Sequence, residues 1–234
     1  MENQFERTEI LIGKDNLEKL RHSQIAIFGI GGVGSYVAES LARVGVGRFI
    51  LIDNDKIDIT NINRQIHATH KTIGKYKVEE MEKRIQEINP DAKVRAIKEF
   101  VTEDNIEKIL NANIDYIVDA IDTVKSKIEI IKKAKQKNMP IISSMGTANK
   151  LDPTKLEITD IYKTSVCPLA KIIRKELRKL EISNLKIVYS KEEPKPPKQN
   201  ADGKLTLGSI SYVPSVAGLI ISSEIVKDII KSSN

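Results

Sequence analysis

The sequence predicts an α/β fold, a doubly wound and mostly parallel sheet with an antiparallel extension on its C-terminal side. Short apolar runs alternate with segments of helical periodicity between residues 24 and 143. A glycine-rich turn, Gly29-Ile-Gly-Gly-Val-Gly34, follows the first apolar run. Asp53 ends the next run, at about the 20-residue distance typical of dinucleotide-binding units. Together these three observations predict a nucleotide-binding sheet.

The alternating elements of this sheet are read from their periodicity. In one segment Val78, Met81, Ile85 and Ile88 recur at helical steps, and Asn89-Pro90 ends the pattern. Strands are expected at 24–28, 48–52, 93–98, 115–119 and 140–143. Helices are expected at 33–45, 75–88, 102–110 and 123–137. Such alternation predicts helices on both faces and a ligand at the carboxyl ends of the strands.

The pattern changes after Gly146. Strands at 155–161, 185–189 and 209–213 and helices at 166–180 and 215–231 are expected there. We therefore divide the chain into a nucleotide-binding domain, 1–150, and an extension, 151–234, packed on the same sheet. A loop at about 190–206, rich in Lys and Pro, is expected to be mobile; it either orders over a bound ligand or is a plain linker.

The glycines make the turn Rossmann-like. Ile25, Ile27 and Phe28 predict a buried strand, and the helix that follows begins near Val33. Its unpaired N–H groups and positive dipole end would point at a ligand above Gly29, Gly31, Gly32 and Gly34. A side chain at Gly31 or Gly34 would push a phosphate away or separate helix from strand.

Polar residues beyond this turn favour a triphosphate over a nicotinamide cofactor. A dehydrogenase needs one acid after the second strand and apolar walls beyond it, whereas here Asp55 follows Asp53. Amide, guanidinium and ammonium groups suit a charged leaving group. Any one of these cations taken alone is more simply a solvated surface residue. The candidate ligands are Asn61, Asn63, Arg64, Gln65 and Lys77.

The charge of the chain suggests a nucleic-acid partner. It carries 38 Lys and Arg against 32 Asp and Glu, a formal charge of +6. The whole excess lies between Lys163 and Lys204, where Lys171, Arg174, Lys175 and Arg178 follow one helix face. This stripe fits a phosphate backbone, and it equally fits the exposed face of an ordinary amphipathic helix. With 4 Phe, 6 Tyr and no Trp, an aromatic stacking platform is not expected.

The composition also indicates the cellular compartment and whether a zinc site is expected. The start of the chain lacks a signal-peptide pattern, and the apolar stretch from Tyr212 to Ile221 is interrupted by Pro214 and Gly218, so no membrane association is expected. One cysteine indicates the cytoplasm. The single cysteine and three scattered histidines do not make a tetrahedral site, so zinc is not expected; His67 and His70 read more simply as polar loop residues.

The glycine turn, Asp53-Asn-Asp55, Thr60-Asn-Ile-Asn-Arg-Gln65 and Gly74-Lys-Tyr-Lys77 resemble, in this order, the adenylating domain of E1-like activating enzymes. The resemblance implies ATP with Mg²⁺ and an ATP-binding adenylation domain in 1–150. It assigns Asp53 to the ribose, Asn61, Arg64 and Lys77 to the phosphates, and Asp122 to Mg²⁺, with Asp55 and Gln65 beside the nucleotide. It also implies a homodimer in which Arg7 completes the neighbouring active site.

Further stretches resemble one branch, the tRNA threonylcarbamoyladenosine dehydratases. They are Leu11-Ile-Gly13, Asp160-Ile-Tyr-Lys-Thr164 with Pro168-Leu169, Val188-Tyr-Ser190, and Gly208 to Gly218. Cys167 stands where an acidic residue is expected in this branch, so it is a poor candidate for a nucleophile. The branch implies ATP-dependent dehydration of N6-threonylcarbamoyladenosine at position 37 of tRNA to its cyclic form, through an acyl adenylate and AMP release. A separate sulfur-transfer protein is a possible partner.

Other readings stay open at this point. An enzyme that adenylates the C-terminus of a ubiquitin-like sulfur-carrier protein would share the ATP half of the site. It would usually add two Cys-x-x-Cys pairs for zinc. A nucleotide-binding scaffold without turnover would be expected to have lost Arg64, Lys77 or Asp122, and all three are present. A dehydrogenase is the most distant alternative.

Overall fold

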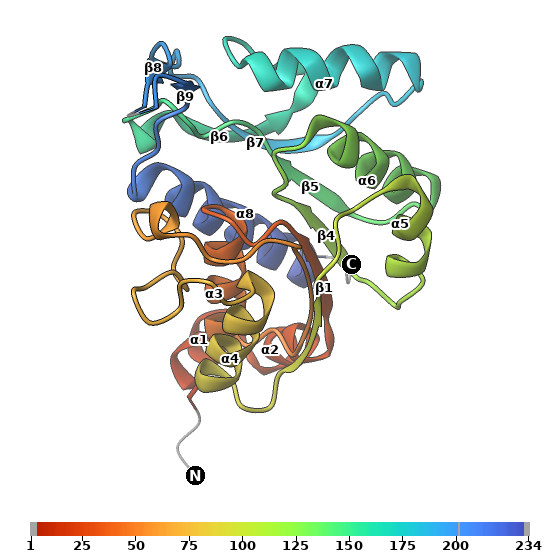
Figure 1. Cartoon of the computed structure of the whole chain (residues 1–234). Coiled ribbons are helices and arrows are strands. Elements are labelled where there is room, and N and C mark those ends of the chain that lie inside the picture. The colour runs from red at the N-terminus through yellow and green to blue at the C-terminus, as the bar shows by residue number, and fades with distance from the viewer. Residues whose placement is uncertain (1–3, 201, 232–234) are drawn as a thin grey trace.

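The apolar runs of the chain form the strands of one central sheet (Figure 1). The structure is a computed structural model that describes residues 4–200 and 202–231, and within these residues seven strands share this sheet. In spatial order they are β3 (Lys93–Ile97), β2 (Arg48–Ile52), β1 (Gln24–Phe28), β4 (Tyr116–Asp119), β5 (Ile141–Ser144), β7 (Lys186–Ser190) and β6 (Leu156–Asp160). Only the pair of β6 and β7 is antiparallel. The predicted fold class is therefore confirmed, with β6 as the antiparallel part.

Both faces of the sheet are apolar because both are covered. In β1, Ile25 and Ile27 belong to one hydrophobic cluster, while Ala26 and Phe28 belong to the other. The central strands consequently lack the alternation of polar and apolar residues that marks a half-exposed strand. One face carries α2 (Lys14–His22), α3 (Gly34–Val44), α4 (Lys77–Ile88) and α8 (Tyr212–Lys231). The other carries α5 (Glu103–Ile109), α6 (Val124–Gln136) and α7 (Pro168–Lys179).

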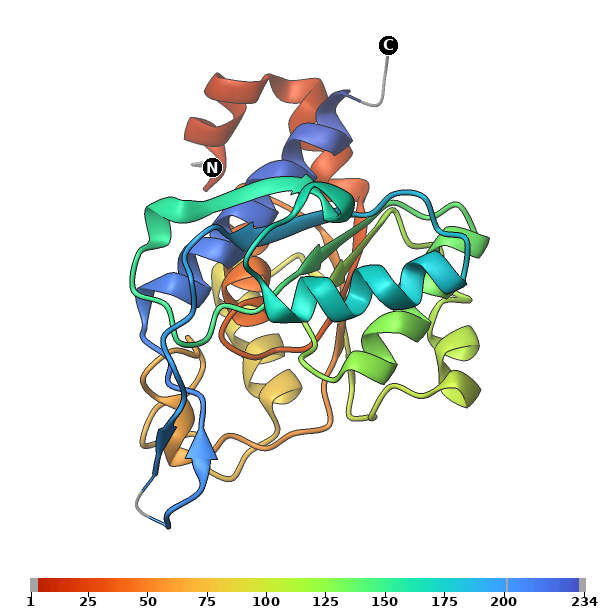
Figure 2. The same ribbon diagram turned by 90° about the horizontal axis from the view of Figure 1, so that it is seen from above.

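Two helices precede the sheet that the sequence patterns did not predict. These are α1 (Glu6–Ile12) and α2, which follow each other directly around Gly13. Leu17 and Leu20 anchor α2, whereas α1 extends beyond the sheet and its helices (Figure 2). Because α2 leads into β1, both helices lie at the amino ends of the parallel strands.

The predicted strand at 209–213 is wrong. Residues 209–211 form no regular element, and Tyr212 already belongs to α8. Pro214 does not prevent this helix, because a proline is well tolerated in the first turn of a helix. Gly218 then lets α8 lie close to α3, because a Cβ atom there would be 2.6 Å from the carbonyl oxygen of Val33.

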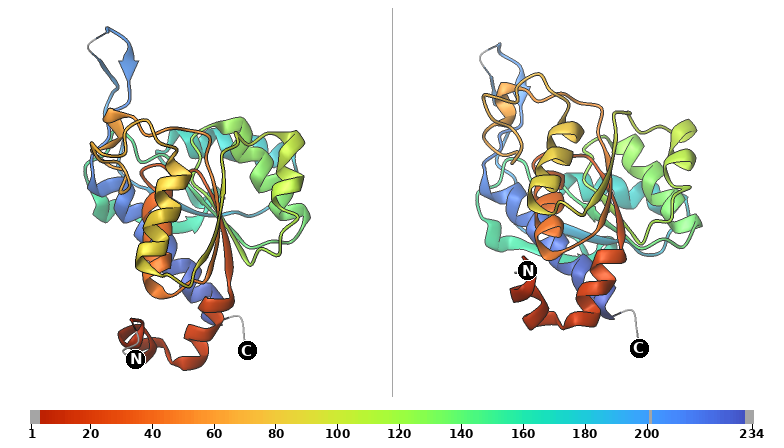
Figure 3. Two further views of the ribbon diagram at one scale, coloured as in Figure 1. Left: turned by 60° about the horizontal axis from the view of Figure 1, so that its bottom comes forward. Right: turned by 90° about the horizontal axis from the view of Figure 1, so that it is seen from below.

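The segment predicted to be mobile contains a short hairpin, β8 (Lys198–Gln199) with β9 (Leu205–Thr206). Figure 3 shows this hairpin projecting from the end of the molecule opposite α1. Three short 3-10 helices complete the described elements, namely η1 (Ile59–Asn61), η2 (Pro153–Lys155) and η3 (Ile161–Lys163). The predicted domain and loop ranges also include residues 1–3, 201 and 232–234, which lie outside the described residues. In the part that the structure describes, no helix has both the length and the apolar character needed to cross a membrane.

Candidate active site

The loops after β1 and β4 meet at the centre of the sheet. The chain runs from β1 to β2 on one side, while β4 leads to β5 on the other. The space between the loops of these two neighbouring strands is the switch point at which this fold class binds ligands in a crevice. Gly29 has a φ of +87°, and a Cβ atom on it would lie 2.7 Å from the carbonyl oxygen of Ala120. Only glycine satisfies both conditions, so this residue sets the floor of the crevice.

The glycine turn holds α3 against β1 and leaves room above it. A Cβ atom at Gly34 would be 1.8 Å from the carbonyl oxygen of Gly29. The helix can therefore approach the strand this closely only because residue 34 is a glycine. At Gly31 the nearest atom would be Nε2 of Gln65, at 3.9 Å, so its missing side chain leaves space. The amides at the start of α3 adjoin this space and favour an anion.

Asp53 ties the ends of β1 and β2 together. The Ile30 N–H donates to its Oδ2 at 2.7 Å, and the Asp55 N–H donates to its Oδ1 at 2.8 Å. Each oxygen keeps a further lone-pair site, which suits the hydroxyl groups of a ribose. Burial raises the pKa of Asp53, while the nearby Lys77 charge and the two amides oppose this rise.

Lys77 is the buried cation of the site. It begins α4, its side chain is 8% exposed, and Nζ donates to Oδ2 of Asp55 at 2.6 Å. The same Nζ lies 4.0 Å from Oδ1 of Asp53. The sequence analysis grouped these three residues around one nucleotide, and the structure brings their charged atoms together.

The segment that contains Asn61 to Gln65 folds over the glycine turn. The Asp58 side chain accepts the Thr60 N–H at 2.8 Å and the Asn61 side chain accepts the Asp58 N–H at 3.1 Å, which closes η1 as a capping box. The Arg64 guanidinium donates to the Thr60 carbonyl oxygen and to Oδ1 of Asn63, both at 2.9 Å. Cγ of Arg64 would be 3.4 Å from a Cβ atom on Gly32, so this side chain runs along the turn.

Two buried polar side chains in this region lack partners. Oε1 of Gln65 and both ring nitrogens of His67 make no hydrogen bond among the described residues. Burial, with the Lys77 and Arg84 charges, lowers the pKa of His67 to about 4. The sequence offered no signal for this buried imidazole, because a histidine between Ile66 and Ala68 reads as a polar loop residue.

A buried ion pair lies behind the loop after β4. The side chains of Asp119 and Lys127 are both 0% exposed, and Nζ of Lys127 donates to Oδ2 of Asp119 at 2.7 Å. Nζ also donates to Oγ of Ser143 at 3.2 Å and to the Ser144 carbonyl oxygen at 3.0 Å. Sequence reasoning missed Lys127, although it shares a helix face with the buried Ile130, Ile131 and Ala134.

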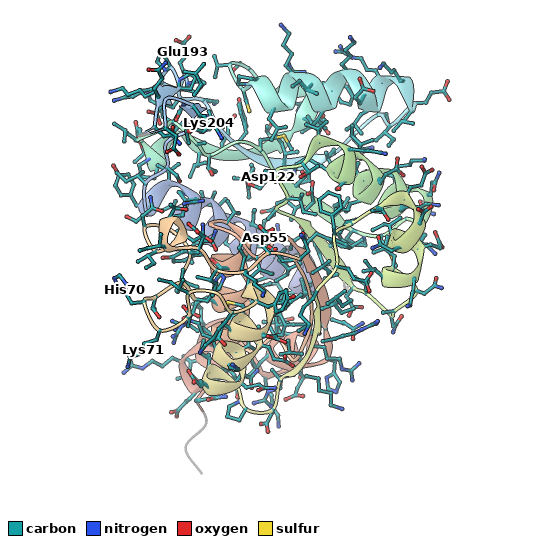
Figure 4. All side chains as sticks on the ribbon, viewed as in Figure 1. Asp55, His70, Lys71, Asp122, Glu193 and Lys204 are labelled. Atoms are coloured by element: carbon teal, nitrogen blue, oxygen red, sulfur yellow. The ribbon has the colours of Figure 1, made fainter. Side chains whose placement is uncertain are left out.

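Asp122 is an exposed acid at the crevice, as is Asp55. Asp122 follows β4 and precedes α6, and its Oδ1 accepts a long hydrogen bond, 3.4 Å, from Oγ1 of Thr123. Figure 4 shows Asp122 and Asp55 near the centre of the view. No group of three or more His, Cys, Asp or Glu side chains within residues 4–200 and 202–231 could hold a metal ion. A Mg²⁺ ion here would therefore take one carboxylate together with phosphate oxygens and water, a donor set that it favours.

The remaining predicted residues lie away from this cluster. Arg7 is exposed on α1, at the opposite end of the strands from the glycine turn. On α7, Lys171 and Lys175 are exposed. The Arg174 guanidinium instead donates to Thr164 and to the Ile161 carbonyl oxygen, and Arg178 lies 5.6 Å from the ring centre of Tyr162. Two of the four predicted RNA contacts therefore already bind the loop before α7.

The fold and this crevice define a class of protein, the nucleotide-binding α/β proteins whose site combines a glycine turn with cations suited to phosphates. The ThiF family model matches residues 5–234, so the chain belongs to the ThiF family. The tRNA threonylcarbamoyladenosine dehydratase of Bacillus subtilis is 44% identical over 99% of this chain and 96% of its own length.

Solved structures extend this likeness to three dimensions. The crystal structure of Escherichia coli tRNA N6-threonylcarbamoyladenosine dehydratase in complex with AMP has a TM-score of 0.92 and 33% identity, covering 98% of this chain and 95% of that chain. The same enzyme in complex with ATP has a TM-score of 0.90, at the same identity and coverage. The resemblance to this branch of E1-like enzymes is therefore confirmed.

Proposed function

We propose that this protein catalyses the ATP-dependent dehydration of N6-threonylcarbamoyladenosine at position 37 of tRNA to its cyclic form. The observation that carries the proposal is the crevice, where Asp53, Arg64 and Lys77 surround a glycine turn and a Cβ atom on Gly31 would meet no atom closer than 3.9 Å. The near full-length likeness to the Bacillus subtilis dehydratase supports the same substrate. The reaction belongs in the cytoplasm, where tRNA is modified.

The chemistry needs ATP because a carboxylate is inert at neutral pH. The threonyl carboxylate attacks the α-phosphate, which forms a mixed anhydride and releases pyrophosphate. A nucleophilic atom of the carbamoyl group in the same substrate then attacks the activated carbonyl carbon, and AMP leaves with the original carboxylate oxygen. The second nucleophile is already held beside the carbonyl, so the enzyme need not supply one. The burial of Cys167 agrees with a reaction in which the enzyme supplies no nucleophile.

Each residue of the crevice has a proposed role. Asp53 accepts the ribose hydroxyls, and the amides at the start of α3 with Asn61, Arg64 and Lys77 hold the phosphates. Asp55 keeps Lys77 in place, and Gln65 lies beside the nucleotide with an unused acceptor. Asp122 would hold Mg²⁺, which neutralises charge on the departing pyrophosphate. Arg7 would enter the neighbouring site of a homodimer, and a sulfur-transfer protein is a possible further partner.

The direct test is turnover of the modified nucleoside. The purified protein is incubated with ATP, Mg²⁺ and tRNA that carries threonylcarbamoyladenosine, and the nucleosides are analysed by mass spectrometry. The modified nucleoside should lose the mass of one water, with one AMP released for each one converted. Asp122→Asn should fold normally and lose this activity. Unmodified tRNA is the control that should yield no AMP.

The alternative, adenylation of a sulfur-carrier protein, is separated by the acceptor. A ubiquitin-like protein with a C-terminal glycine should not stimulate pyrophosphate exchange with ATP, whereas the modified tRNA should. Exchange driven only by the carrier protein would reject the proposed function in favour of this alternative.

A further inference from the structure

A second hollow, a pocket, lies between residues 149–151 and the β8–β9 hairpin. Its volume is about 400 Å³, within the range of sites for small ligands. Three lysines and three apolar side chains define its character, namely Lys150, Lys195, Lys198, Leu151, Leu207 and Ile210. No carboxylate is among the described residues that line it.

The walls of this pocket are held by one residue. Asn149 has a left-handed conformation, with a φ of 58°. Its backbone bonds the chain on both sides of the β8–β9 hairpin: its N–H donates to the Gly208 carbonyl oxygen, and its carbonyl oxygen accepts the Lys195 N–H. Its side chain bonds the same two residues: Oδ1 accepts the Gly208 N–H at 2.5 Å, and Nδ2 donates to the Lys195 carbonyl oxygen at 2.8 Å. The pocket is therefore a built feature of the fold.

Among the described residues, no carboxylate forms an ion pair with the lysines of the pocket lining. Lys150 is 3% exposed, and the hydrogen bond of its Nζ, to the Ser190 carbonyl oxygen at 3.2 Å, leaves it donors to spare. Glu192, which is not among the lining residues, uses its carboxylate to accept the N–H groups of Leu151 and Asp152 at 2.8 to 3.0 Å. A ligand with a negative group beside an apolar body complements this lining.

The pocket also touches the crevice. Nδ2 of Asn63 donates to the carbonyl oxygen of Ser209 at 3.0 Å, and Oδ1 of Asn63 accepts from Arg64. A few residues further on, Pro214 would be 3.2 Å from a Cβ atom on Gly32. One continuous segment, 208–214, thus forms part of both the pocket and the wall of the glycine turn.

We propose that this pocket binds a single-stranded nucleotide of the substrate RNA, next to the adenosine whose carboxylate enters the crevice. The lysines would hold its phosphate, and Leu151, Leu207 and Ile210 would pack against its base. Sequence-specific RNA recognition mostly uses unpaired nucleotides whose bases are turned out of the stack. This inference rests on the proposed function, because it assumes that the substrate of the crevice is part of an RNA loop.

The test compares two variants of equal charge. Lys195→Ala/Lys198→Ala removes two cations from the pocket, and Lys191→Ala/Lys204→Ala removes two from the same segment outside it. An anticodon stem-loop that carries threonylcarbamoyladenosine is titrated at several salt concentrations. The pocket variant should bind about tenfold more weakly and reduce the slope of log K against log salt by about 1.4. The control variant should bind like the wild type, and both should bind ATP normally.

A cross-link gives the position directly. 4-Thiouridine is placed on either side of the modified adenosine, and the cross-linked peptide is identified by mass spectrometry. Peptides from residues 195–210 are expected. Equal RNA affinities for the two double variants, or cross-links found only on α7, would overturn the pocket assignment. If the wild type neither binds nor converts the stem-loop, the proposed function itself fails.

Discussion

At the scale of single residues, His67 is the side chain whose surroundings most constrain its chemistry. It is buried, and its two ring nitrogens lack partners among the described residues. Its pKa falls to about 4 because of burial and of the nearby Lys77 and Arg84 charges. The folded protein therefore holds a neutral imidazole, whereas the unfolded chain protonates it near pH 6.5.

This difference predicts acid sensitivity. Below pH 6.5 the unfolded state binds more protons at this residue, so its contribution to stability falls as the pH decreases towards 4. Between pH 7 and pH 5 the wild type should lose roughly 2 kcal/mol more in free energy of unfolding than His67→Gln does. Urea unfolding at both pH values measures this. His70→Gln, which removes an exposed imidazole, should follow the wild type, and equal pH dependence in all three proteins would contradict the prediction.

Two glycines of the turn should respond differently to the same change. A Cβ at Gly34 meets a backbone oxygen at 1.8 Å, so Gly34→Ala should lose roughly 3 kcal/mol of stability or more. A Cβ at Gly31 meets nothing closer than 3.9 Å, so Gly31→Ala should fold normally and bind ATP more weakly, because its methyl group enters the phosphate space. Urea unfolding and calorimetric titration with ATP separate the two effects. Unchanged ATP affinity in Gly31→Ala would place the phosphates elsewhere.

At the scale of elements, the Asp119–Lys127 pair joins the carboxyl ends of β4 and β5 to α6. A buried charge without its partner is far more costly than the intact pair, so Lys127→Met should lose about 3–5 kcal/mol. The double variant Lys127→Met/Asp119→Asn leaves no buried charge and should recover more than half of that loss. Thermal unfolding would test it, and a double variant no more stable than the single one would show that packing, rather than charge, dominates.

The sequence predicted some of these elements well for a physical reason. The bounds of β1 and β2 agree with the apolar runs, because a strand buried on both faces is apolar throughout. α1 was not predicted, since it is short and exposes Ile10 and Leu11. The strand predicted at 209–213 is wrong because local sequence does not show the long-range packing of Gly218 against α3, which accompanies a helix there.

Within the site, too, some residues could be predicted from the sequence and others could not. The order of the motifs was enough to group Asp53, Asp55 and Lys77, because each follows or begins a regular element. It could not identify Lys127 or Asn149, whose partners come from distant parts of the chain. The roles of the predicted ligands remain proposals for the experiments above.

At the scale of the whole molecule, α1 and the crevice lie at opposite ends of the parallel strands. Arg7 therefore does not reach the crevice of its own chain, and the role proposed for it requires a second subunit. On the same helix Ile10 and Leu11 are 78% and 84% exposed, which suits burial against another subunit.

Complementation tests this arrangement. Arg7→Ala and Lys77→Ala should each be inactive, while their mixture should regain about a quarter of wild-type turnover, because half of the randomly formed dimers contain one intact site. Activity is measured after the subunits have exchanged, with unmixed variants as controls. Full activity of Arg7→Ala, or no recovery on mixing, would rule out a shared site.

The clamp at Asn149 has a consequence for how such enzymes diversify. Because the Asn149 side chain closes the base of the hairpin, we expect changes of length or sequence between Lys195 and Gly208 to leave the central sheet in place. New RNA specificity would then arise from substitutions on the surface of the hairpin, while the ATP site stays unchanged.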